Sequence, residues 1–294
     1  MELRQLEYLV TVVDEASFTR AAARLHVAQP GVSAQIRRLE REVGQELLDR
    51  TGRAVRPTEA GATVLPHARA ALAAVAQAKL AVDELTGLVR GRVAMGVLTG
   101  CGGLDLAGLL ARFHDDHPGV EISLIEDNSD RLISALRSGR LDVAVIGAAG
   151  PERPEIHTHL LMDEPVVAAV GLADPWAGRS SVTLAELCTR DLIGMPVGTG
   201  LRASLDQACA TYALEPRIAF QAGDPGVLLR LAARGLGVAV VARSMADNAA
   251  DLHAVAVTEP ELRGRVELAW RADGPISPAA RALIGHARVA LRRV

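Results

Sequence analysis

The first sixty residues contain three short stretches in which apolar positions recur every three or four residues, the spacing of an amphipathic helix. The stretches span Leu3–Glu15, Phe18–Leu25 and about Gln29–Val43. Ser17 is a favourable N-cap for the second stretch, Pro30 suits the first turn of the third, and Gly44 ends it. The pattern predicts three helices joined by tight connections.

The second and third helices match a helix-turn-helix, in which the second of the pair enters the major groove of DNA. If Val32, Ile36 and Leu39 are buried, polar side chains lie on the opposite face. Asp49–Pro57 then places three arginines around Gly52, which predicts a basic hairpin wing. Arginines on a single helix are usually only solvated, but the order of cap, turn, helix and wing favours binding. The predicted contacts to double-stranded DNA are Ser17, Thr19, Gln29, Pro30, Ser33, Arg37, Arg38, Arg50 and Arg53.

A longer pattern follows from Thr58, with apolar residues alternately three and four positions apart. These positions are Val64, Ala68, Ala71, Val75, Ala78, Val82, Leu85 and Val89. They predict a long helix with a coiled-coil seam, and Pro66 should bend its first turns. We expect this helix to dimerise the chain, because helix-turn-helix heads commonly read two half-sites. The alternative is a helix packed on its own domain.

Beyond residues 88–92 the pattern changes to alternating strands and helices, which predicts a parallel α/β sheet. Strands are expected at 92–99, 120–127, 141–147, 164–172, 192–195, 217–221, 236–241 and 265–270. Helices are expected at 105–117, 130–138, 183–188, 201–213, 224–234 and 278–292. The predicted segments are 1–58, 59–89 and 90–294.

Charge and composition sharpen this picture only slightly. Residues 1–92 hold 13 basic and 11 acidic side chains, whereas residues 93–294 hold 19 and 24. DNA binding must therefore come from the arrangement of the arginines rather than from bulk charge. Cys101, Cys188 and Cys209 form no CxxC pair, so a disulfide framework or zinc site is not expected. A charged N-terminus and the absence of a long apolar run predict a cytoplasmic protein without membrane contact.

The stretch from Leu3 to about Pro66 resembles the LysR-type family of bacterial transcriptional regulators, and the remainder does so more loosely. The resemblance implies an α/β protein with an N-terminal winged helix-turn-helix domain, a long linker helix and a two-lobed, periplasmic-binding-protein-like effector domain. It assigns residues 1–58 to DNA binding, 59–89 to the linker and dimerisation helix, and 90–294 to effector binding. Within the last, lobe I covers about 92–160 and 266–294, and lobe II about 161–265. It also implies that Gln29, Pro30, Ser33 and Arg37 approach the major groove and that Arg53 serves in the wing. Four residues of the head depart from the family pattern: Ala28 replaces a capping residue, Gly31 an alanine, Ala34 a base-contacting arginine, and Leu48 a phenylalanine.

In such two-lobed sheets a ligand binds beyond the carboxyl ends of the strands. The residues expected at those ends are Thr99, Gly100, Cys101, Gly102, Asn128, Ser129, Gly147, Pro196, Gly198, Thr199 and Asp224. Each glycine loop has the alternative explanation of a simple turn. Cys101 stands where the family often has a hydroxyl, so its thiol is a candidate ligand contact.

The predicted function is a ligand-responsive regulator, activator or repressor, that binds promoter DNA as a homodimer or homotetramer. It would sense a small-molecule effector between the lobes, need no cofactor or metal, and contact RNA polymerase if it is an activator. We do not expect an enzyme, because the scattered histidines lack a third ligand and no catalytic motif occurs. A solute-binding protein would leave residues 1–90 unexplained.

Overall fold

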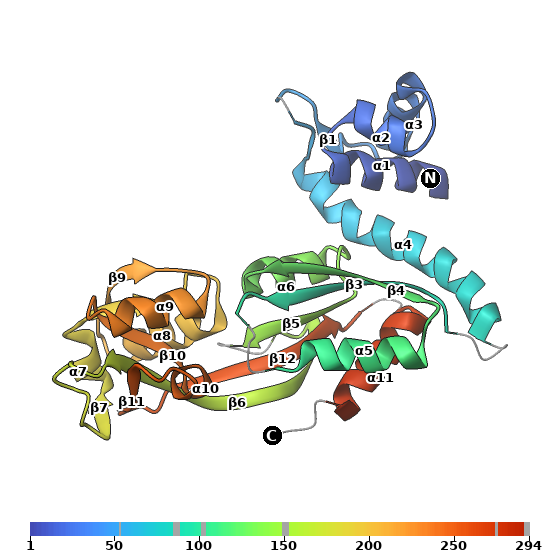
Figure 1. Cartoon of the computed structure of the whole chain (residues 1–294). Coiled ribbons are helices and arrows are strands. Elements are labelled where there is room, and N and C mark those ends of the chain that lie inside the picture. Colours follow the sequence, from blue (N-terminus) through green and yellow to red (C-terminus); the bar gives the residue numbers. More distant parts are fainter. Residues whose placement is uncertain (53, 85–88, 101–103, 149–152, 274–275, 291–294) are drawn as a thin grey trace.

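The protein folds into a helical head, a long helix and a two-lobed α/β domain (Figure 1). This computed structural model describes residues 1–52, 54–84, 89–100, 104–148, 153–273 and 276–290. In the long helix, the side chains of residues 77 and 79–84 are also outside the description. No helix in these ranges is both long and apolar enough to cross a membrane.

The head contains α1 (Leu3–Glu15), α2 (Phe18–Arg24) and α3 (Gln29–Val43), which confirms the three predicted helices. Ser17 caps α2 by accepting a hydrogen bond from the Arg20 amide at 3.4 Å. Ala28 precedes α3 without a side-chain cap, and Gly44 ends it with φ of 77°. Val32, Ile36 and Leu39 are fully buried in a core that joins all three helices. The bounds, the Ser17 cap and the buried positions of these helices therefore agree with the sequence prediction.

The predicted wing is a short antiparallel hairpin of β1 (Leu48–Asp49) and β2 (Arg56–Pro57). It leads directly into α4, and the Leu47 carbonyl approaches the first turn of that helix closely. A Cβ added at Gly61 would lie 2.0 Å from that oxygen. Arg53, a predicted DNA contact, lies outside the described residues.

The predicted long helix is α4 (Glu59–Glu84), but part of its apolar seam does not face a partner chain. Leu65 and Ala68 are buried in the core of the head, and Val64 and Ala71 pack against that core. The first three residues of the predicted seam therefore pack within their own chain. Val75 is 43% exposed and continues the seam beyond the head.

The effector domain contains a mixed sheet rather than a purely parallel one. Lobe I holds β4 (Val120–Asp127), β3 (Gly91–Leu98) and β5 (Val143–Ala148) in parallel. Lobe II holds β10 (Val238–Ala242), β8 (Asp191–Gly194) and β9 (Arg217–Gln221) in parallel. The antiparallel pair β6 (Ile156–Gly171) and β12 (Arg263–Arg271) joins the lobes. The parallel prediction thus holds within each lobe and is wrong at the crossovers, where long strands return through both lobes.

Helices cover the faces of both lobes. Lobe I has α5 (Leu106–Asp116), α6 (Ser129–Arg137) and α11 (Pro278–Ala290), and lobe II has α7 (Leu184–Cys188), α8 (Gly200–Thr211), α9 (Pro225–Ala233) and α10 (Arg243–Asp247). Separate apolar clusters fill the space between these helices and the sheet. The predictions missed α10 and two strands, β7 (Ser181–Thr183) and β11 (Leu252–Thr258). β7 is too short to give a periodic signal.

Candidate functional site

The exposed face of α3 holds most of the predicted DNA contacts in the described part of the head. Gln29, Pro30, Arg37 and Arg38 are exposed. Ser33 is only 9% exposed, and its hydroxyl accepts a hydrogen bond from Arg37 Nη2 at 3.1 Å. The expected exposure of Ser33 is therefore wrong, because this position lies one turn before Ile36, at the edge of the buried stripe. The Ser17 hydroxyl accepts from the Arg20 amide as the N-cap of α2, and Thr19 is exposed on the same helix.

Carboxylates neutralise some of the predicted arginines. Arg38 lies 3.4 Å from Glu42 and 3.6 Å from Glu2, and Arg50 lies 2.5 Å from Glu40. Within the described ranges Arg37 forms no such pair. Beside it is a surface groove of about 840 Å³, which Arg41 and Arg50 also line. Of the predicted arginines that the structure describes, Arg37 is the exposed one without an acidic partner, and Arg41, which was not predicted, shares both properties.

The predicted effector residues meet in a small cavity between the lobes, of about 50 Å³. Its lining includes six of them: Thr99, Gly100, Asn128, Ser129, Gly147 and Thr199. Pro196, Gly198 and Asp224 do not line it, and Cys101 and Gly102 lie outside the described residues. The Asp224 carboxylate instead caps α9, accepting from the Gly226 amide at 2.8 Å. Loop position alone therefore identified the cavity but not every residue in it.

The two lobes close tightly over this cavity through glycines. A Cβ on Gly200 of α8 would lie 2.7 Å from backbone atoms of Gly147 on β5. A backbone hydrogen bond of 3.2 Å also crosses the cleft, from the Asp130 amide to the Gly198 carbonyl. This is a closed arrangement of the lobes. A side chain at Gly200 is incompatible with it, and a Cβ at Gly147 would lie in tight contact, 3.0 Å from the Gly200 Cα.

The charged residues of the cavity, Glu164 and Arg265, were missed by sequence reasoning. Glu164 accepts from the amide and the hydroxyl of Ser244, at 2.8 and 2.9 Å. Arg265 lies 3.5 Å from Asp163 and also lines a larger surface cavity of about 940 Å³ between β5, β6 and α8. Both residues come from the crossover strands rather than from loops. The charge of Glu164 at the start of the apolar run at 164–172 was a signal for that residue alone, and no local pattern pointed to Arg265.

The two described cysteines lie together in lobe II. The Sγ atoms of Cys188 and Cys209 are 3.5 Å apart. Burial, reinforced by the neighbouring thiol, raises the pKa of Cys209 to about 12. A reactive thiol needs a lowered pKa and access to solvent, so Cys209 has the opposite environment. No group of three or more candidate metal ligands occurs among the described residues.

Comparison with known proteins assigns both halves of this architecture. Residues 3–62 match the bacterial regulatory helix-turn-helix protein family, lysR type, and residues 86–292 match the LysR substrate binding domain. The chain belongs to the LysR family of transcriptional regulators. It therefore has a DNA-binding helix-turn-helix domain and an effector-binding domain, as the resemblance implied.

Relatives extend the match over nearly the whole chain. The regulator ShiR of Corynebacterium glutamicum is 37% identical over 82% of both chains, and the regulator YnfL of Escherichia coli is 33% identical over 99% of both. Among solved structures, full-length OxyR of Pseudomonas aeruginosa is 26% identical, with a TM-score of 0.74 over 98% of both chains. CbnR in complex with its target DNA is 25% identical, with a TM-score of 0.61 over 99% of this chain and 100% of that one.

Proposed function

We propose that this LysR-family regulator reads promoter DNA through the exposed face of α3, as a homodimer, and responds to a small molecule bound between its lobes. The uncompensated charge of Arg37 on that face is the observation that carries the DNA-binding assignment. Gln29, Pro30 and Arg37 would approach the major groove. Arg38, Arg50, Arg53 and the N-terminal end of α2, with Ser17 and Thr19, would contact the backbone.

The ion pairs of Arg38 and Arg50 with carboxylates lower the contribution that these two arginines would make to DNA affinity. Each must exchange an acidic partner for a phosphate, so its net contribution to affinity is smaller than that of Arg37. Ser33 would act by holding the Arg37 guanidinium rather than by reading a base. The predicted residues would therefore contribute unequally to DNA affinity, with the largest contribution from Arg37.

The walls of the effector cavity indicate the ligand class. Thr99, Ser129 and Thr199 supply hydroxyl groups, and Met162, Met195 and Met245 supply adaptable apolar surface. This suits a small organic molecule with an apolar body and one or two hydrogen-bonding groups. Since the closed cavity has only about 50 Å³, the lobes must separate to admit it. The other predicted effector residues, Pro196, Gly198 and Asp224, would act at the rim.

The test of DNA binding uses the full chain and the DNA segment upstream of its own gene, with a scrambled segment for comparison. Arg37→Ala should lower affinity by about 1–3 kcal/mol, or roughly 5- to 150-fold. Arg112→Ala removes an exposed arginine from α5 and should change affinity less than about twofold. An equal loss for both variants, measured by fluorescence anisotropy, would contradict the assignment. Gln29→Ala should weaken binding to the upstream segment more than to the scrambled one.

The dimer is proposed to form through the exposed part of α4. Val75→Asp should shift the full chain toward monomer in analytical ultracentrifugation, because a carboxylate would face the partner helix. Leu236→Asp, at another exposed apolar position, should leave the mass unchanged. A dimer insensitive to Val75→Asp would place the interface elsewhere. A tetramer, and contact with RNA polymerase by an activator, would need further surfaces of the effector domain.

A further inference from the structure

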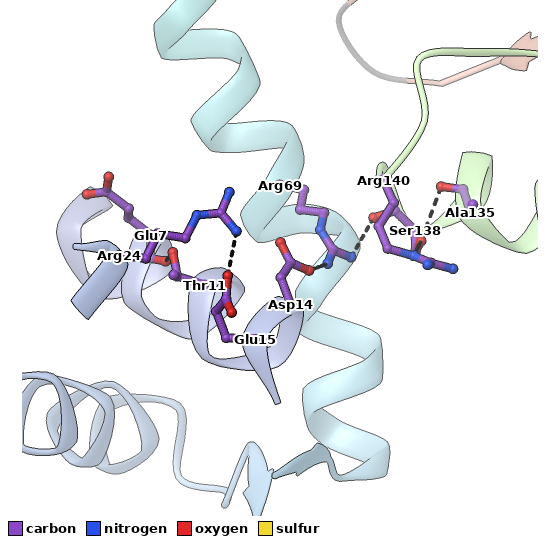
Figure 2. Close-up of polar contacts among 9 residues, drawn as sticks. All are labelled: Glu7, Thr11, Asp14, Glu15, Arg24, Arg69, Ala135, Ser138 and Arg140. Atoms are coloured by element: carbon purple, nitrogen blue, oxygen red, sulfur yellow. Dashed lines mark hydrogen bonds and ion pairs between the residues drawn. The ribbon is translucent and has the colours of Figure 1, made fainter. Parts of the chain in front are cut away.

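Arg69 of α4 is the point where the three parts of the chain meet (Figure 2). Its Nη2 forms an ion pair with Asp14 on α1 of the head. Its Nη1 donates to the main-chain carbonyl of Ser138 in lobe I, at 3.0 Å. The side chain is only 10% exposed. One largely covered guanidinium thus bonds the DNA-binding head and the effector domain at the same time.

The geometry requires arginine. Two nitrogens of one planar group donate in different directions, which the single ammonium of lysine cannot reproduce with the same spacing. The lobe I partner is a main-chain carbonyl, so the bond depends on the position of the backbone at Ser138 rather than on a side-chain rotamer. A shift of that backbone therefore acts directly on Arg69.

The backbone at Ser138 is itself held firmly. The Ser138 hydroxyl donates to the Ala135 carbonyl and accepts from Arg140 Nε, both at 3.2 Å. The adjacent Gly139 has φ of 67° and packs on α4, where a Cβ would lie 3.3 Å from Arg69 Cβ. The end of α6 is therefore fitted closely against the linker helix at this arginine.

The opposite end of α6 lies in the effector cleft. The Ser129 hydroxyl accepts from the Gly147 amide at 2.9 Å, and the Asp130 amide donates to Gly198 of lobe II at 3.2 Å. The helix has nine residues and is about 13 Å long. One short, rigid element thus touches lobe II at its first turn and Arg69 at its last.

We propose that Arg69 is a positioning residue that sets the orientation of the head according to whether the lobes are closed. Opening of the cleft breaks the bond between Asp130 and Gly198 and lets α6 move as a unit. Its carbonyl end then shifts against Arg69, and the pair with Asp14 passes the shift to α1. This inference rests on the proposed function, because it concerns how the effector cleft acts on DNA binding.

The coupling can be tested without knowing the effector, because the cleft can be opened by substitution. Gly200→Ala places a Cβ 2.7 Å from the Gly147 backbone, so the lobes must separate. Gly285→Ala adds a methyl group on α11 with nothing within 4 Å and is the matched control. Affinity for the upstream DNA segment is measured for the full chain with each substitution, with Arg69 present and with Arg69→Met.

With Arg69 present, Gly200→Ala should change DNA affinity at least about fivefold, in either direction, the lower range of allosteric coupling. With Arg69→Met the same substitution should change affinity less than about twofold. The coupling is the ratio of affinities with and without Gly200→Ala within each background, so it does not depend on the affinity of Arg69→Met itself. If Gly200→Ala acts equally in both backgrounds, or has no effect with Arg69 present, the proposal is overturned.

Two further variants separate positioning from simple stabilisation. Arg137→Met removes an arginine from the same α6 whose partner, Glu155, lies within lobe I, and should leave the Gly200→Ala effect intact. Asp14→Ala removes only the head partner and should abolish the effect as Arg69→Met does. Loss of coupling in Arg137→Met would point to general weakening of lobe I instead. Failure of the parent chain to bind the DNA at all would refute the proposed function, an outcome distinct from each of these.

Discussion

The head and the effector cleft are built in opposite ways. The exposed face of α3 comes from fifteen consecutive residues above one local core. The cleft gathers side chains from Leu98 to Val266, and most of its lining comes from strand ends and helix starts far apart in the chain. A single helix keeps its surface if neighbours shift slightly, whereas the cleft exists only while two lobes keep their spacing. The head is therefore suited to reading a fixed partner, and the cleft to changing shape.

The space around the glycines also differs between the head and the cleft. Gly31 on α3 has nothing within 4 Å of an added Cβ, so the exposed face of α3 is unobstructed at this position. Gly147 and Gly200 touch across the cleft, so the lobes approach as closely as backbones allow. The head has one comparably close approach, at Gly61, where the wing meets α4. That position offers the strongest perturbation of the head.

Gly61→Ala should have the largest effect. Its Cβ would lie 2.0 Å from the Leu47 carbonyl, and neither backbone segment can move without displacing the wing from α3. We expect a loss of about 3 kcal/mol in the stability of the head and a fall in DNA affinity of about tenfold or more. Calorimetry should show the effector domain melting as in the parent chain.

Gly31→Ala is the matched control for that substitution. It adds the same methyl group in open space and raises helix propensity, so the head should gain about 0.5–1 kcal/mol. A similar destabilisation by both alanines would mean that the approach of the wing to α4 does not hold the head together.

The contrast also explains what the sequence alone could predict. Caps, proline positions and apolar spacing are local, so α1–α3 and the ends of β4 and β9 agree with expectation. Ser33 was misplaced because one helical step separates an exposed from a buried position. Glu164 and Arg265 were missed because the pairing of β6 with β12 brings them to the cleft, and no local pattern encodes that pairing. For the seam of α4 a partner chain was favoured over packing on the same chain, although its first three residues pack on the head.

Ser129→Ala tests the cleft and should have an intermediate effect. The buried hydroxyl accepts from the Gly147 amide, and its removal leaves that donor unpaired. We expect a cost of about 1–3 kcal/mol, seen as a lower melting temperature of the effector domain. DNA affinity below that melting temperature should change far less than in Gly61→Ala. Ser134→Ala, exposed on the same helix, should leave the melting temperature nearly unchanged.

A smaller effect is expected at Asp142, which directly precedes β5, at the end of the strand opposite to Gly147 of the cleft. Burial raises the pKa of this carboxyl, although the Ala94 amide donates to it at 2.8 Å. A carboxyl whose pKa is higher in the folded than in the unfolded chain loses stabilising effect as pH rises through that interval. Asp142→Asn should thus raise the free energy of unfolding at pH 7, by less than about 1 kcal/mol, and less at pH 4. Asp115→Asn, at an exposed position, provides the comparison, and a larger gain at pH 4 would contradict the sign.

The smallest effect is expected for alkylation of Cys209. This experiment tests whether lobe II stays rigid when the cleft moves. With a pKa of about 12, its thiol stays protonated at pH 8, and its Sγ lies in the core under α8. Iodoacetamide should therefore leave Cys209 unmodified in the native chain and modify it in urea, as peptide mass spectrometry can show. Alkylation of native Cys209 within minutes would mean that α8 lifts from the sheet on that timescale. In that case the movement of the cleft would include deformation of lobe II, and the separation of two rigid lobes would no longer describe it.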